Sequence, residues 1–290
     1  MFSKKTTTLS IESTSIRCLI SDGKTVEWWG SAPMEAGIVR DGSVLEQKAL
    51  AENIDYLLQS TKKSKEKVVV SLTGLHFTFR TLSVPKLKSD ELDASVKRAA
   101  QKEMPLPLEE IYLTWQLLGT RKDKQEVFVL GVPREPVDLL IAALGEAGIK
   151  PYIMDLKSLA LARVAGRREA LLLDLEPDNF GITLVAEGVP TIMRTFIPRR
   201  GDMILEDNVR RLAGEIVRTV EFYNRDHSEN PVSPDIPVFL TGEMADSPDT
   251  SSIVQDEIEY PIAPLSLPFG HDPAFPAASF AVNVGLALRG

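Results

Sequence analysis

One pattern of hydrophobic and polar residues occurs twice, near the start of each half of the chain. Residues 9–23 (LSIESTSIRCLISDG) and residues 173–188 (LDLEPDNFGITLVAEG) each read as a short apolar strand, a polar turn and a second, alternating strand. Each copy ends in an Asp-Gly or Glu-Gly pair, which favours a hairpin turn. Two such units in matching register predict a duplicated domain whose paired turns face a common cleft.

The two turns also match in their polar residues. Ser10 and Asp174 end the first strand of each copy, and Glu12 and Glu176 follow two residues later. In duplicated folds of this kind the two turns grip the phosphate chain of a nucleotide from both sides. These four positions are therefore the first candidates for a binding site.

The remaining hydrophobic pattern predicts alternating strands and helices. The predicted strands cover residues 26–29, 67–72, 77–84, 111–118, 126–132 and 238–241. The predicted helices cover residues 48–60, 89–103, 134–147, 157–165, 202–226 and 280–289. Residues 227–237 and 261–276 are predicted loops. Residues 74–157 read as a β-α-β-β-α unit, which we expect to be a small subdomain inserted between the two halves.

The composition is that of a globular chain long enough for two domains. Of the 290 residues, 43% are hydrophobic and 26% are charged, and the formal net charge is −8. This negative charge argues against a general nucleic-acid binder, which needs a basic surface. Cys18 is the single cysteine, so we expect no disulfide framework. No signal peptide is visible, and no apolar run approaches the ~20 residues of a membrane span, so we expect a soluble, cytoplasmic protein.

The sequence lacks the common catalytic templates. It contains no Gly-x-Ser-x-Gly elbow, no His-Glu-x-x-His motif and no Walker A loop. Its three histidines, His76, His227 and His271, lie far apart and have no metal-ligand spacing. We therefore expect no catalytic residue.

Several residues of the repeated turns do suit a phosphate ligand. A phosphate-binding hairpin needs exposed backbone N–H groups, hydroxyls and a cation. The first copy supplies the hydroxyls of Ser13, Thr14 and Ser15 and the cation of Arg17. In the second copy, Asp174 is a candidate to hold Mg²⁺ through water.

A third element follows later in the chain. Residues 238–245 (VFLTGEMA) read as a strand that ends at Gly242, against whose backbone an adenosine would lie. The order of the three elements and of the inserted subdomain resembles the actin-like superfamily. More narrowly, it resembles the PilM family of type IV pilus assembly proteins, which is related to the cell-division protein FtsA.

The resemblance extends over nearly the whole chain. None of the matching segments is specific alone, so their order carries the resemblance. The matching segments are Gly37–Gly42, Leu82–Pro85, Ser89–Leu92, Glu103–Pro107, Ala147–Pro151, Ser158–Ala162, Glu215–Arg218 and Gly285–Arg289.

The resemblance implies an α/β fold of two actin-like domains, each RNase H-like and related by duplication, with an inserted β-α-β-β-α subdomain. The first domain would comprise residues 1–73, 158–170 and 277–290. The inserted subdomain would comprise residues 74–157, and the second domain residues 171–276.

The chain departs from the family pattern in both turns. Ser10 and Glu12 stand where the first turn of the family carries Asp and Gly, and Arg17 replaces a Lys. In the second turn, Glu176 follows Asp174 where the family reads Asp-x-Gly. Each lost glycine adds a side chain where a phosphate would touch the backbone.

The third element departs as well, because a Gly-Gly pair has become Gly242-Glu243. Glu12 and Glu176 would both face a polyphosphate. Two unit charges ~4 Å apart repel by ~4 kcal/mol at an effective dielectric constant of ~20. This repulsion opposes ATP unless Mg²⁺ intervenes.

A small lid subdomain of the second half is also expected to be lost. The family places it after the position of Arg200, but here the chain passes almost directly into the helix of Glu215 and Arg218, which would border the cleft. We expect a degenerate nucleotide cleft without a cofactor. MgATP is the alternative ligand, and Asp174 would be a metal ligand only in that case.

The resemblance implies a cytoplasmic scaffold or adaptor at the inner membrane. Its expected partner is the cytoplasmic N-terminal peptide of a PilN-like bitopic membrane protein. That peptide would lie in a groove built from residues near 77–85, the helix 89–103 and the first domain. Two alternatives remain open: an active actin-like ATPase of the pilus assembly machine, and an FtsA-like division or filament protein.

Overall fold

The computed structural model describes residues 5–59, 67–74, 77–198 and 205–289. Its first sheet has the strand order β10-β6-β1-β2-β3. The pairs β1–β2 and β2–β3 are antiparallel, whereas β6 runs parallel to both β1 and β10. The strands of this sheet are β1 (Thr6–Ile11), β2 (Ser15–Ser21), β3 (Val26–Pro33), β6 (Val68–Leu72) and β10 (Pro151–Leu156). A short hairpin of β4 (Val39–Arg40) and β5 (Ser43–Val44) lies outside it.

The second sheet repeats this topology with the order β13-β12-β11-β14. Its first three strands are antiparallel in sequence order, and the last pairs in parallel with β11. The strands are β11 (Ala170–Leu175), β12 (Phe180–Ala186), β13 (Val189–Phe196) and β14 (Val238–Thr241). The matching orders β3-β2-β1-β6 and β13-β12-β11-β14 confirm the predicted duplication.

Seven α-helices are assigned in the described residues. They are α1 (Gln47–Gln59), α2 (Ser89–Glu103), α3 (Arg134–Glu146), α4 (Lys157–Ala165), α5 (Leu205–Asp226), α6 (Pro248–Glu257) and α7 (Ala281–Ala287). Two 3₁₀ turns, η1 (Leu108–Glu110) and η2 (Glu243–Asp246), accompany them. Helix α6 and strands β10 and β13 were not predicted from the sequence. Residue 60 and residues 202–204, which were predicted to be helical, lie outside the described residues.

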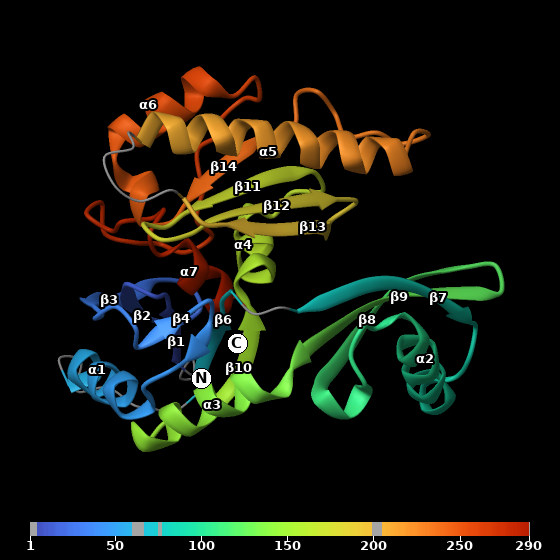
Figure 1. Cartoon of the computed structure of the whole chain (residues 1–290), viewed down its shortest axis with the longest axis horizontal. Coiled ribbons are helices and arrows are strands. Elements are labelled where there is room, and N and C mark those ends of the chain that lie inside the picture. The colour runs from blue at the N-terminus through green and yellow to red at the C-terminus, as the bar shows by residue number, and fades with distance from the viewer. Residues whose placement is uncertain (1–4, 60–66, 75–76, 199–204, 290) are drawn as a thin grey trace.

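Helices and sheets alternate as layers (Figure 1). Helices α1 and α3 pack on the outer face of the first sheet, where Leu50 and Ile54 join its core. Helices α4 and α7 lie between the two sheets, and α5 and α6 cover the far face of the second. Strands β1, β6 and β11 are buried along their whole length, because a helix layer or the other half covers both faces.

A third sheet projects from the first half (Figure 1). It has the order β7-β9-β8 and consists of β7 (Thr78–Pro85), β8 (Ile111–Arg121) and β9 (Lys124–Pro133). Helix α2 covers one face, where Leu92, Val96 and Ala100 pack against Val127 and Val129 of β9.

The predicted β-α-β-β-α order of the inserted unit is present, but its last helix belongs elsewhere. Helix α3 packs against α1, and β10 pairs with β6 in the first sheet. The reason is hydrophobic: Leu140 and Leu144 of α3 are buried in the core of the first half. The domain boundaries given above stay a prediction.

The connection between β13 and α5 is short. Phe196 ends β13 and Leu205 begins α5, so residues 197–204 leave no room for a helical subdomain. Residues 199–204, where the sequence analysis placed the lost lid, lie outside the described residues.

Helices α4 and α7 approach closely at a glycine, which yields a stability prediction. A Cβ on Gly285 would overlap the backbone of Ala160, so Gly285→Ala should lower the free energy of unfolding by about 1–3 kcal/mol. Gly214 in α5 is the matched control, because a Cβ there meets nothing within 4 Å. Gly214→Ala should raise stability by about 0.5–1 kcal/mol. Urea unfolding measures both changes, and a neutral Gly285→Ala would contradict this packing.

Candidate functional site

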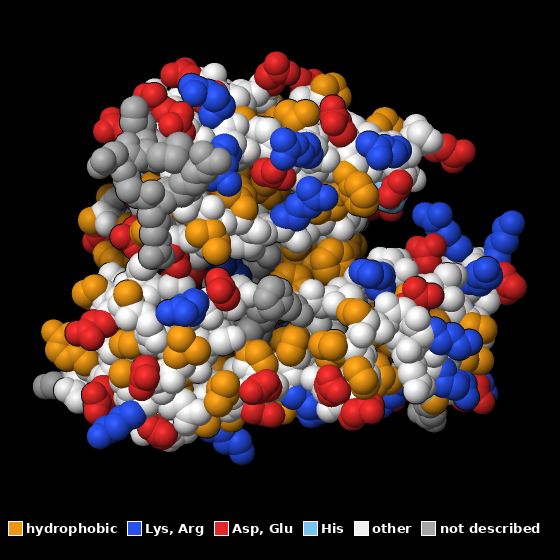
Figure 2. Space-filling view, in the orientation of Figure 1, with side chains coloured by type: hydrophobic (Ala, Val, Ile, Leu, Met, Phe, Trp, Pro, Cys, Tyr) orange, Lys and Arg blue, Asp and Glu red, His pale blue; other side chains and the backbone are white. Residues whose placement is uncertain are grey.

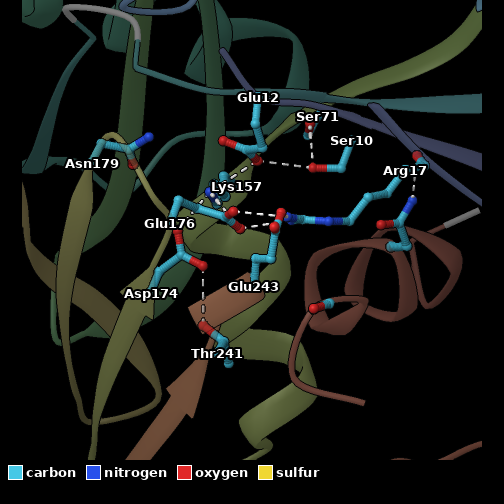
Figure 3. Close-up of polar contacts among 12 residues, drawn as sticks. Ser10, Glu12, Arg17, Ser71, Lys157, Asp174, Glu176, Asn179, Thr241 and Glu243 are labelled. Carbon is cyan, nitrogen blue, oxygen red and sulfur yellow. Dashed lines mark hydrogen bonds and ion pairs between the residues drawn. The ribbon is translucent and has the colours of Figure 1, made fainter. Parts of the chain in front are cut away.

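The structure brings the two repeated turns together between the halves of the molecule (Figure 3). They have the same backbone geometry: the N–H of Glu12 donates to the carbonyl of Ser15 at 2.9 Å, and the N–H of Glu176 donates to that of Asn179 at 3.0 Å. Both glutamates thereby point from equivalent positions into one buried space, in which each is fully buried. The two turns therefore face one another, as the sequence predicted.

Lys157, the first residue of α4, lies between the turns. Its Nζ is 2.9 Å from Glu12 Oε1, 2.5 Å from Asp174 Oδ2 and 3.8 Å from Glu176 Oε1. One ammonium group therefore contacts carboxylates from both halves (Figure 3).

Arg17 of β2 provides the second cation. Its guanidinium binds both oxygens of Glu176 at 2.7 and 2.8 Å and contacts Glu243 at 2.9 Å. Arg17 is only 2% exposed, so this is a two-point, charge-assisted contact in a desolvated setting. The backbone of Arg17 is fixed too, since Asn283 of α7 donates to its carbonyl at 3.1 Å.

We call the six charged residues of this site the ion cluster: Arg17, Lys157, Glu12, Asp174, Glu176 and Glu243. Hydroxyl groups surround it. Ser71 donates to Ser10 at 3.4 Å, and Ser10 donates to Glu12 at 3.1 Å. Thr241 donates to Asp174 at 3.2 Å. Ser10 and Thr241 thus each support a buried carboxylate, and Ser71 supports Ser10.

Gly242 and Glu243 adjoin the ion cluster at the end of β14. Gly242 has φ +91°, and a Cβ there would lie 2.5 Å from the carbonyl oxygen of Leu175, so the position requires glycine. This close approach places Glu243 beside Arg17, although half of the Glu243 side chain remains exposed.

The other expected site residues lie outside the ion cluster. Ser13, Thr14 and Ser15 form the first turn, and within the described residues the hydroxyls of Thr14 and Ser15 have no hydrogen-bond partner. Glu215 and Arg218 of α5 pair with each other at 2.5 Å, and the half-buried Glu215 also lies 4.0 Å from Arg194 of β13. Helix α5 packs on the face of the second sheet that lies away from the first half. The structure therefore does not place the Glu215–Arg218 pair beside the turns.

Burial and charge oppose each other within the ion cluster. Burial raises the pKa of Glu12 to about 7, although Lys157 acts in the opposite direction. Burial also raises the pKa of Asp174. For Glu176, burial acts upward, but Lys157 and Arg17 outweigh it and lower the pKa.

The two cations stay charged. Burial alone would lower the pKa of Lys157, but Asp174, Glu12 and Glu176 together raise it. The pKa of Arg17 is raised in the same way, chiefly by Glu176. These cations are fixed by ion pairs, so the arrangement is suited to holding the two halves together rather than to transferring a proton.

Sequence reasoning missed Lys157, although one signal was present. A cation in the first turn of a helix opposes the helix dipole, and the first turn of α4 otherwise reads Ser-Leu-Ala. A lysine at this position needs carboxylates from elsewhere in the fold. Ser71 and Thr241 were also missed, and no motif marks either of them.

A second candidate site is an apolar groove of about 830 Å³ beside the third sheet. Its lining comes mainly from β8, β9, α3, β10, α4 and the start of β13, together with Leu72 of β6 and Arg289. Figure 2 shows hydrophobic side chains gathered in the hollow between the third sheet and the half of the molecule that carries α5. The segments 77–85 and 89–103, where we expected the groove, do not line it. They lie apart because β7 is the far strand of its sheet and α2 covers the opposite face.

Two further properties limit the chemistry of the described residues. No group of three or more His, Cys, Asp and Glu side chains is placed to hold a metal ion, so a role of Asp174 in metal binding stays a prediction. No described helix combines the length and apolar character of a membrane-spanning segment.

Comparisons with known proteins agree with this architecture. The family model of the type IV pilus assembly protein PilM matches residues 9–192. A chain of the PilM-PilN type IV pilus biogenesis complex is 23% identical, with a TM-score of 0.79 over 99% of this chain and 98% of that one.

More distant solved structures share the fold. The cytoplasmic domain of EpsL, an inner-membrane component of the type II secretion system of Vibrio cholerae, is 14% identical, with a TM-score of 0.54 over 99% of this chain and 96% of that one. A Bacteroides thetaiotaomicron protein with an actin-like ATPase fold is 11% identical, with a TM-score of 0.50 over 98% and 96%. The chain therefore has the actin-like fold.

The raised pKa of Glu12 predicts a pH-dependent stability. An unfolded glutamate ionises near pH 4.5, whereas Glu12 in the folded protein ionises near 7. Between these values the folded state binds more protons, so the free energy of unfolding should fall as the pH rises, by up to about 3 kcal/mol. Glu12→Gln keeps an acceptor for Ser10 and should flatten this slope. Urea unfolding from pH 5 to 8 measures it, with the exposed Glu35→Gln as control. An unchanged slope in Glu12→Gln would contradict the assignment.

Proposed function

The chain belongs to the family of the type IV pilus assembly protein PilM, and from this we propose that it is a scaffold of a pilus-type assembly complex at the inner membrane. Its partner is the cytoplasmic N-terminal peptide of a PilN-like single-span membrane protein. The similarity to a chain of the PilM-PilN complex supports this choice of partner. The protein is held at the membrane through that partner.

The observation that carries the proposal is the apolar groove, whose walls come from separate parts of the fold. On β8 and β9, Thr114 and Gln116 lie on the same sheet face as Phe128 and Leu130. The opposite walls come from Ile141 of α3 and the elements β10, α4 and β13. A partly apolar groove with walls from several elements suits a peptide whose side chains fill pockets in it.

Strand β8 adds a backbone template to the groove. It pairs with β9 on one side and forms the edge of its sheet within the described residues. Consecutive residues from Tyr112 to Gln116 line the groove, so the free edge of the strand borders it. Such an edge offers unpaired N–H and C=O groups, to which an extended peptide adds as a further strand.

The cleft between the halves holds no nucleotide in this proposal. The residues of the two turns do not fit MgATP. The carboxyl groups of Glu12 and Glu176 occupy the space where the phosphate chain would lie, and a carboxyl group does not attract phosphate. Arg17 and Lys157, the cations that would attract phosphate, are already paired at 2.5–2.9 Å. Opening the site would separate buried ion pairs, at about 3–5 kcal/mol for each broken pair.

Two neighbouring leucines of β8 test the groove. Leu118 is 38% exposed and lines it, whereas Leu117 is 42% exposed and does not. Leu118→Glu should weaken binding of the PilN-like peptide at least tenfold, because a charge enters an apolar wall. Leu117→Glu is the matched control and should change the affinity less than twofold.

Fluorescence anisotropy with a labelled synthetic peptide of the partner's N-terminal cytoplasmic residues measures the dissociation constant. Equal affinities for the Leu117→Glu and Leu118→Glu variants would place the peptide elsewhere. A wild-type protein that does not bind the peptide would overturn the proposal.

A calorimetric titration tests the nucleotide part of the proposal. The folded wild-type protein, mixed with MgATP or MgADP, should give no binding heat at protein concentrations that detect a Kd of about 100 μM. Binding at micromolar concentrations would show that the ion cluster opens around phosphate, and an actin-like ATPase would then become the preferred function. Circular dichroism on the same sample establishes that the protein is folded.

A further inference from the structure

The ion cluster and the groove meet at one short segment, the junction of β10 and α4. Asp155 and Leu156 at the end of β10 line the groove, as do Leu159 and Arg163 of α4. Lys157, between them, is a central residue of the ion cluster. Residues 155–163 therefore connect the two sites without any intervening element.

Helix geometry separates the two roles. Leu159 and Arg163 are four residues apart and so share one face of α4. Lys157 precedes Leu159 by two residues, which turns its side chain roughly 200° away. One face of the helix thus forms a groove wall. Its first residue, Lys157, reaches the carboxylates of the ion cluster (Figure 3).

The position of this wall depends on charged contacts at both ends. Lys157 is held by Glu12 from the first half and Asp174 from the second. No side chain caps the N-terminus of α4, and a cation there is disfavoured by the helix dipole. The surrounding carboxylates offset this unfavourable position of the cation. Four residues after Leu159, Arg163 forms an ion pair with Asp155 and donates to the carbonyl of Gly285 at 3.0 Å.

We propose that Lys157 is a positioning residue for the groove: the ion cluster fixes the β10–α4 wall, and changes in the cluster alter the affinity for the peptide. None of the six cluster residues lines the groove, so the effect passes through the position of the wall. This inference rests on the proposed function, since it needs a peptide that binds in the groove. The ion cluster thus influences the affinity for the peptide without contacting it.

The test compares peptide affinity in variants that remain folded. Lys157→Met replaces the cation with an uncharged side chain of similar length but leaves three carboxylates close together. The double variant Lys157→Met/Asp174→Asn removes the cation with its nearest carboxylate, which limits the charge imbalance and keeps the protein folded. Both should bind the PilN-like peptide at least about fivefold more weakly than the wild type, the lower end of typical coupling between sites. Lys157→Arg, which keeps the charge, should recover part of this loss.

A destabilised control separates positioning from general loss of stability. Val254 of α6 is fully buried in the core of the second half and far from the groove lining. Val254→Ala should lower the melting temperature but leave the peptide dissociation constant within twofold of the wild-type value. If Lys157 affected binding only through overall stability, Val254→Ala and the double variant would weaken binding equally when their melting temperatures are equal.

The outcomes are distinct. Weaker binding in the folded double variant with an unchanged Val254→Ala control supports the positioning role. Wild-type affinity in the folded double variant overturns it while the proposed function stands. Absence of binding by the wild-type protein overturns the proposed function itself.

Discussion

The contact of Lys157 with carboxylates from both halves is the constraint on which this structure depends. Burying an unpaired ammonium or carboxylate would cost several kcal/mol, and removal of one partner of a buried pair typically costs about 3–5 kcal/mol. The ion cluster avoids this penalty only while Glu12, Asp174, Glu176 and both cations stay together. The network therefore opposes displacement of the halves, alongside the hydrophobic core of α4 and α7 that lies between them.

The duplication explains how such a network arises. The two hairpins have the same turn, yet Arg17 pairs across its hairpin with Ser10, whereas Gly181 pairs with Asp174 at the corresponding place. A Cβ on Gly181 would lie 3.3 Å from the Asp174 Cβ, so the second hairpin has little space for a larger residue there. One copy thus supplies a cation and the other a second carboxylate. The two copies have thus diverged at equivalent positions, and Arg17 of the first copy pairs with Glu176 of the second, which joins the copies directly.

Sequence reasoning could predict the features that depend on local patterns. The hairpins, the long helix α5 and the meeting of the two turns follow from strand alternation, turn residues and helical spacing. Lys157 could not be assigned, because its partners are 145 residues before it and 17 residues after it in the chain. The location of the groove depends on which edge of the third sheet faces the first half. Helix α3, which lines the groove, packs against α1 in the core of the first half, and no short motif encodes this long-range packing.

A fold whose halves are joined by its own side chains has consequences for peptide binding. In a cleft closed by a ligand, the relative position of the halves varies with the ligand, and the walls between them vary as well. Here, ion pairs of Arg17 and Lys157 already join the two halves. A groove whose walls already have their final position loses less conformational freedom when a peptide binds, and this raises affinity without any added contact. The buried charges, which contribute little to stability by themselves, are then best understood as the means by which the groove keeps one shape.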